Sequence, residues 1–112
     1  MEHQMKLNES SFERIKSGKK RIEIRLFDEK RQNPNLSDTI YFSKLPHLNE
    51  QLSVEVIGLL RYRTFKNLGE DFPISCFGYP DDHDKRAFVE SMHPIYSKED
   101  EQKYGVLGIK IV

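Results

Sequence analysis

The chain has 112 residues, 37% of them hydrophobic and twelve of them aromatic, which is enough for one domain with its own core. Its 18 basic and 18 acidic residues cancel, which excludes nucleic-acid binding through bulk charge. No apolar run reaches the about 18 residues of a membrane helix, and residues 1–10 lack the apolar stretch of a signal peptide. Cys76 is the only cysteine and allows no internal disulfide. We therefore expect a cytoplasmic protein of one domain, residues 1–112, without membrane contact.

The charges are unevenly distributed along this neutral chain. Residues 14–31 hold eight Lys or Arg against three acidic residues, whereas residues 70–103 hold nine acidic residues against four basic ones. Two interpretations remain open. The two regions pack side by side and neutralise each other, or the first region forms a local basic site.

The first half of the chain predicts one helix and three strands. The helix covers residues 10–17, with Ser10 and Glu13 at capping-box spacing and Gly18 as its stop. Strict alternation then predicts a half-buried strand, with Ile22, Ile24 and Leu26 on one face and Arg21, Glu23 and Arg25 on the other. Residues 39–42 and 52–63 are the next strands, the second with a bulge near Gly58.

The second half predicts short helices and a closing strand. Residues 64–69 are expected to form a helical turn that ends at Gly69, and residues 72–84 a long ordered aromatic loop over the barrel mouth or core. Helices are predicted at 84–92 and 96–105, the second capped by Ser97 and stopped by Gly105. Residues 106–112 close the chain as a strand.

This element order predicts an α+β fold that is mainly β, a small mixed β-barrel flanked by short α-helices. The last strand is expected to close the barrel by pairing with earlier strands. We expect one barrel-like core with these buried members: Phe12, Ile22, Ile24, Ile40, Phe42, Val54, Val56, Leu107 and Ile109.

Residues 18–25, GKKRIEIR, resemble the G-x-K-x-x-E-x-R signature of the ASCH domain family. Two further segments are similar to that family, SDTIYF at 37–42 and YGVLGIKIV at 104–112, although Ser37 stands where the family usually has glycine. The resemblance implies a β-barrel like that of the PUA domain, an RNA-binding module. It also implies a cleft beside the barrel, lined by the polar residues of the motif, with RNA or a nucleotide as the ligand.

The chemistry of these side chains fits such a ligand. Arginine offers a rigid fork for a phosphate or a base edge, and lysine a mobile charge. Glu23 can accept from a base amino group or hold Arg25 in position; an ordinary surface pair of Arg25 and Glu23 is the alternative. A second stretch interleaves basic and aromatic residues around Tyr62. The candidate nucleic-acid-binding residues are Lys20, Arg21, Glu23, Arg25, Arg61 and Arg63.

Catalysis is an alternative function. Some short members of the resembled family hydrolyse the acetyl amide of acetylated cytidine nucleosides, using a lysine of the motif, a threonine three residues later and a downstream glutamate. Lys20 matches the lysine, Glu23 stands in the place of the threonine, and the downstream glutamate has no clear match. If the protein is an enzyme, Lys20 and Glu23 are its candidate catalytic residues.

A third interpretation is a protein-interaction module. The protein would then be a monomer that binds a partner protein, or a weak homodimer formed through the aromatic loop. Residues 81–84, DDHD, are sequence neighbours at a predicted helix cap, so we expect no metal site there and no cofactor. Cys76 lies among apolar residues and is expected to be buried and inert.

Overall fold

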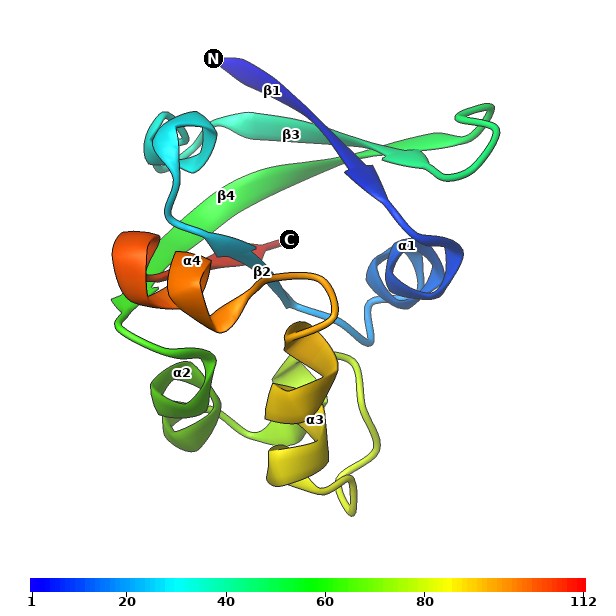
Figure 1. The fold of residues 1–112 in the computed structure, drawn as a ribbon. Coiled ribbons are helices and arrows are strands. Elements are labelled where there is room, and N and C mark those ends of the chain that lie inside the picture. The colour runs from blue at the N-terminus through cyan, green and yellow to red at the C-terminus, as the bar shows by residue number, and fades with distance from the viewer.

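A computed structural model describes all residues, 1–112, and shows a curled sheet of five strands (Figure 1). The order in the sheet is β1-β3-β4-β5-β2; β1 runs parallel to β3 and the other pairs are antiparallel. The predicted α+β fold with a barrel-like sheet is confirmed, but β1 and β2 do not pair, so the barrel is half open. The strands are β1 (Glu2–Leu7), β2 (Ile22–Leu26), β3 (Thr39–Lys44), β4 (Gln51–Tyr62) and β5 (Val106–Ile111).

Four short helices flank the sheet. Helix α1 closes one end, while α2, α3 and α4 lie together on another side (Figure 1). The longest helices have eight residues, and none has the length and apolar composition of a membrane span. The helices are α1 (Glu9–Lys16), α2 (Phe65–Asp71), α3 (Lys85–Met92) and α4 (Lys98–Tyr104), with single 3-10 turns at Glu29–Gln32 and Ile74–Cys76.

Some predicted boundaries are wrong for local reasons. Strand β1 was not predicted, because its segment is polar and leaves only Leu7 fully buried. Helix α1 begins earlier than expected, since Asn8 rather than Ser10 is its cap and accepts a hydrogen bond from the Ser11 amide at 2.8 Å. Helix α2 continues past Gly69 to Asp71, and Gly69 is buried against the Phe88 ring.

Other local predictions are confirmed. The register of β4 against β5 shifts between Val56 and Gly58, as a bulge requires. Gly18 takes a left-handed φ of 81° after α1. Ser37 has a φ of 73°, so the position where the resembled family usually has glycine keeps the backbone conformation that favours glycine.

The buried side chains form two clusters rather than the single predicted core. The barrel core lies between α1 and the sheet and consists of Leu7, Phe12, Ile15, Ile40, Phe42, Val54, Val56, Leu107, Ile109 and Ile111. The helical core lies between β2 and the layer of α2 and α3 and consists of Ile22, Ile24, Leu26, Phe65, Leu68, Ile74, Phe77, Phe88 and Val106.

Strand β2 separates the two clusters, and this placement explains two corrections. All five of its residues are buried, so the half-buried strand expected from the alternation is wrong. Its apolar face, with Ile22 and Ile24, packs into the helical core rather than the barrel core. Its polar face, with Glu23 and Arg25, is covered as well.

Candidate functional site

The turn after α1 places the start of the motif against the aromatic loop. The Lys20 amide donates to the Arg14 carbonyl at 3.0 Å, which folds the chain back along the helix. Lys20 also forms an isolated β-bridge with Phe77, and the Arg21 amide donates to the Cys76 carbonyl at 2.8 Å. Backbone pairing therefore fixes the aromatic loop beside the motif.

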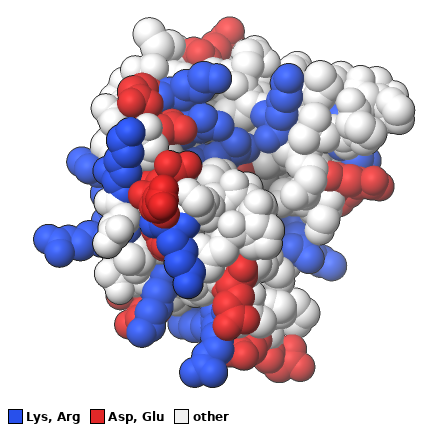
Figure 2. All heavy atoms as spheres, in the orientation of Figure 1, with Lys and Arg blue, Asp and Glu red and all other residues white.

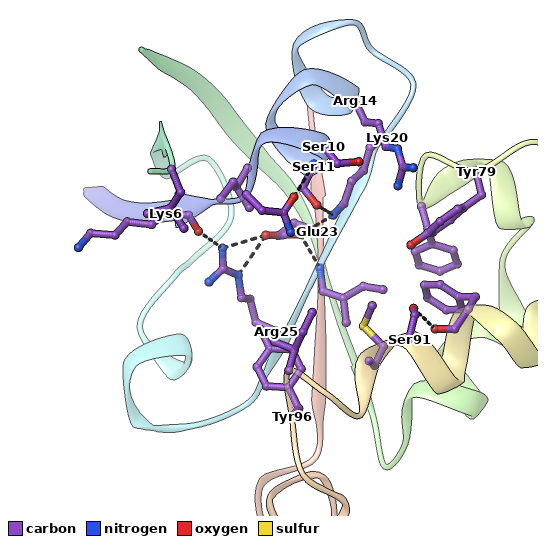
Figure 3. A pocket seen from close by; sticks show the side chains of 18 residues that line it. Lys6, Ser10, Ser11, Arg14, Lys20, Glu23, Arg25, Tyr79, Ser91 and Tyr96 are labelled. Atoms are coloured by element: carbon purple, nitrogen blue, oxygen red, sulfur yellow. Dashed lines mark hydrogen bonds and ion pairs between the residues drawn. The ribbon is translucent and has the colours of Figure 1, made fainter. Parts of the chain in front are cut away.

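The polar face of β2 carries a buried ion triad. Glu23 is only 3% exposed and lies between Lys20 and Arg25 (Figure 3). Its Oε1 is 2.8 Å from the Lys20 ammonium, and its Oε2 is 2.9 Å from Arg25 Nη2 and accepts from Arg25 Nε at 3.1 Å. The Ile24 amide also donates to Oε1, at 3.1 Å. The ordinary surface pair considered for Arg25 and Glu23 is therefore excluded.

The triad keeps Glu23 ionised. Burial alone would raise the pKa of this carboxyl, but the positive charges of Lys20 and Arg25, and the hydrogen bonds that both donate, outweigh burial. The pKa of Glu23 therefore lies below its ordinary value.

Arg25 also ties together the two open edges of the half-barrel. Its Nη2 donates to the Lys6 carbonyl at the end of β1, 3.0 Å away. The guanidinium thus connects β2 to β1, two edge strands that do not pair with each other in the sheet. This contact gives Arg25 a structural task beside any contact with a ligand.

A pocket of about 510 Å³ opens over the triad, between α1, the end of β1, the aromatic loop and α3 (Figure 3). We call it the motif pocket. Four basic side chains and one acidic side chain line it: Lys6, Arg14, Lys20 and Arg25 with Glu23. Its apolar wall includes Ile24, Phe77, Phe88 and Met92.

Three residues that line the motif pocket, Arg14, Tyr79 and Tyr96, are not among the candidate site residues predicted from the sequence. The guanidinium of Arg14 lies 4.6 Å from the centre of the Tyr79 ring and is in none of the ion pairs. Tyr96 forms another wall, stacked on Phe65 at 5.7 Å, and burial raises the pKa of its phenol. Arg14 had been counted only in the basic run, and the position of Tyr79 depends on loop geometry that no periodicity encodes.

The structure brings only part of the predicted site together. Lys20, Glu23 and Arg25 converge in the motif pocket, but Arg21 is exposed outside it and points Nη2 at the Cys76 sulfur, 3.5 Å away. Arg61 and Arg63 lie at the end of β4 on a different groove.

The acidic region does not neutralise the basic stretch through ion pairs. Basic residues between 14 and 31 pair with Glu23, Asp28 and Glu50, all outside residues 70–103. In the DDHD segment, Asp84 caps α3 and His83 stacks on Tyr79 with ring centres 4.4 Å apart. No group of three or more His, Cys, Asp or Glu side chains is arranged to hold a metal ion.

Comparisons with known proteins agree with this architecture. The family model described as ASCH domain matches residues 5–112. A crystal structure of the hypothetical protein PH0355 is similar over 99% of this chain and 97% of its own, with 37% identity and a TM-score of 0.86. A solution NMR structure of protein PF0455 from Pyrococcus furiosus is similar over 99% of this chain and 96% of its own, with 33% identity and a TM-score of 0.77. A search of curated proteins found no match.

Proposed function

The chain belongs to the ASCH domain family, and on that premise we propose that the motif pocket binds one nucleoside unit of single-stranded RNA. The PUA-like fold is consistent with RNA binding. The observation that carries the proposal is the motif pocket itself, with aromatic walls and basic side chains gathered over the buried triad. Its volume lies in the range of about 300–1,000 Å³ that is usual for small-ligand sites.

The pocket offers a distinct contact for each part of a nucleotide. The Tyr96 ring supplies a face on which a base can stack, which is worth about 1–3 kcal/mol per base. The Tyr79 ring is already covered by His83 at 4.4 Å and by the Arg14 guanidinium at 4.6 Å, and it helps to position that guanidinium. The Lys20 ammonium has three donors, and only two are engaged, by Glu23 and by the Ser11 hydroxyl at 3.4 Å. Its remaining donor and the unpaired Arg14 are available for a phosphate or a base acceptor.

Arg25 takes a different part from the one suggested by the sequence. Its Nε and Nη2 are engaged by Glu23 and by the Lys6 carbonyl. We therefore assign it to positioning Glu23, and through Glu23 the ammonium of Lys20, rather than to direct recognition of RNA.

The first test compares two arginines of the same basic stretch. We expect Arg14→Gln to weaken binding of a short fluorescent single-stranded RNA about three- to tenfold and to reduce the salt dependence of the affinity. Arg21→Gln removes the same charge outside the motif pocket and should change the affinity less than about twofold. Fluorescence anisotropy at two salt concentrations measures both. Equal losses in the two variants would contradict a specific site and point to general attraction.

The amidohydrolase alternative leads to an opposite expectation. Such a reaction needs a nucleophile and a base to activate it. The Glu23 carboxylate is held between two cations with a lowered pKa, which makes it a weak base. The nearby Ser11 hydroxyl accepts a hydrogen bond from the Lys20 ammonium, which is paired with Glu23 and, as an ammonium, has no lone pair to take the hydroxyl proton. We therefore expect no acetate release from acetylated cytidine above the rate without protein, measured by chromatography. Release that Lys20→Ala abolishes would instead make the protein a hydrolase.

The homodimer alternative remains a prediction. Part of the aromatic loop expected to form the contact is turned inward, since Phe77 is 1% exposed and Tyr79 lines the motif pocket.

A further inference from the structure

A second groove lies on the other side of the connection between α3 and α4. Its volume of about 1010 Å³ is larger than that of the motif pocket, and it is bounded by the end of β4, by His93 and by α4. We call it the α4 groove. The residues that line it are Arg61, Tyr62, Arg63, Thr64, His93, Lys98, Glu101, Gln102, Lys103, Tyr104 and Gly105.

The α4 groove carries basic side chains that form no ion pair, although Glu99 and Asp100 are exposed in the first turn of α4. Its four Lys and Arg residues are exposed, and none takes part in an ion pair: Arg61, Arg63, Lys98 and Lys103. The one carboxylate in its lining, Glu101, is 9% exposed and accepts a hydrogen bond from the Phe65 amide at 2.7 Å. Figure 2 shows basic side chains projecting from the side where α4 and the end of β4 lie, with acidic side chains among them.

Two of these cations are held over aromatic rings. The Arg61 guanidinium lies 3.8 Å from the centre of the Phe27 ring, and the Lys103 ammonium 5.0 Å from that of Tyr104. Such contacts orient a cation without cancelling its charge. An exposed row of oriented, unpaired cations suits a chain of phosphates, because each phosphate contact releases counterions.

The α4 groove and the motif pocket share one wall. Ile95 and Tyr96 in the connection between α3 and α4 line the motif pocket, whereas His93 and Lys98 line the α4 groove. The Phe65 ring packs against this connection. Its centre lies 5.7 Å from that of the stacked Tyr96 ring and 6.3 Å from that of the His93 ring, which it meets edge-on. A strand that leaves the motif pocket can therefore enter the α4 groove by crossing a few residues, among them Ile95, which is 61% exposed.

We propose that the α4 groove binds the phosphodiester backbone of the RNA strand whose nucleoside occupies the motif pocket. This rests on the proposed function and extends it: the motif pocket holds one nucleoside, and the α4 groove supplies affinity that grows with strand length and carries no base preference.

The experiment compares RNA lengths in a double variant and its control. Fluorescence anisotropy is measured with a trinucleotide and a decanucleotide of single-stranded RNA at several salt concentrations. We expect Arg63→Gln with Lys103→Gln to weaken decanucleotide binding about tenfold and, at about 0.7 per phosphate contact of a single strand, to lower its salt slope by about 1.4, with trinucleotide binding unchanged. The control, Lys85→Gln with Arg86→Gln, removes two exposed charges of α3 that line neither site, and should leave both affinities within about twofold.

Two outcomes would overturn the inference, and they are distinguishable from failure of the motif pocket. If the decanucleotide binds no tighter than the trinucleotide, or the control loses as much affinity as the test variant, the α4 groove is not a backbone site while the motif pocket stands. If the trinucleotide and free nucleosides give no NMR shifts around residues 18–25, the proposed function fails and the inference fails with it.

Discussion

Replacing Glu23 by glutamine is expected to lower the free energy of unfolding by about 3–5 kcal/mol, although the two side chains have nearly the same shape. The substitution leaves Lys20 and Arg25 as neighbouring cations, each with only 10% of its side chain exposed, and without the carboxylate that compensates them. Removing one member of a buried charge cluster is costly because the remaining charges stay desolvated. Urea denaturation at neutral pH measures the loss.

A surface glutamate serves as the matched control. Glu13 pairs with Lys44 at 2.7 Å, but its side chain is 49% exposed. Exposed pairs contribute about 0–1 kcal/mol, so Glu13→Gln should change the free energy of unfolding by less than about 1 kcal/mol. Similar losses in both variants would show that burial does not set the importance of Glu23.

The same variant carries a signature in pH. Because the pKa of Glu23 is lower in the folded protein than in the unfolded chain, its stabilisation is complete above the unfolded pKa and is lost as pH falls through the folded pKa. Wild-type stability should therefore fall more steeply than that of Glu23→Gln as pH decreases below about 4.5. Hydrogen bonds from His3 and from the Asn35 amide lower the pKa of Asp38 to about 2. Asp38 therefore adds the same acid dependence to the wild-type protein and to the variant.

The triad also changes how the other motif variants are to be interpreted. Lys20 and Arg25 are candidate nucleic-acid-binding residues from the sequence, which makes Lys20→Ala and Arg25→Ala the obvious variants for a binding test. Arg25→Ala would remove both the Glu23 contact and the bond to the Lys6 carbonyl, so its effect on binding is mixed with an effect on stability. Arg14 lies in the same pocket without a carboxylate partner and is the better probe of the ligand contact.

Local patterns in the sequence were enough to predict most elements but not their layering. The alternation of Ile22 and Ile24 indicated the strand, and Gly18 and Gly105 marked helix ends, because these signals depend only on neighbouring residues. Alternation predicts that the two faces differ; it does not say that the polar face is exposed. The polar face is covered by distant parts of the chain, as the bond from Arg25 to the carbonyl of Lys6, 19 residues earlier, illustrates, and no local pattern contains such a contact.

The sequence likewise predicted some residues of the candidate site and missed others. Lys20, Glu23 and Arg25 were found because they belong to one contiguous motif. Tyr79 and Tyr96 come from an irregular loop and from a helix connection, and reach the pocket only through packing around Phe65, Phe77 and Phe88. Arg61 and Arg63 form a second candidate stretch in the sequence, and the structure separates this stretch from the motif pocket by the connection between α3 and α4.

Phe88→Ala is expected to reduce stability by about 3–5 kcal/mol and to weaken RNA binding as well. Phe88 is 1% exposed and belongs to the helical core, while its ring also lines the motif pocket. It stacks on Phe77 at 4.8 Å and meets the Tyr79 ring edge-on at 5.7 Å. Truncation removes part of the aromatic wall of the pocket and the support of the Tyr79 ring that helps to position Arg14.

The existence of two cores provides the control for this prediction. Phe42 is 0% exposed, belongs to the barrel core and does not line the motif pocket. Phe42→Ala should cost a similar 3–5 kcal/mol, yet leave RNA affinity within about twofold when binding is measured on folded protein at low temperature. Urea denaturation and anisotropy on the same samples separate the two effects. If both variants lose affinity equally, binding depends on global stability rather than on the wall that Phe88 supports; if neither does, the aromatic wall takes no part in recognition.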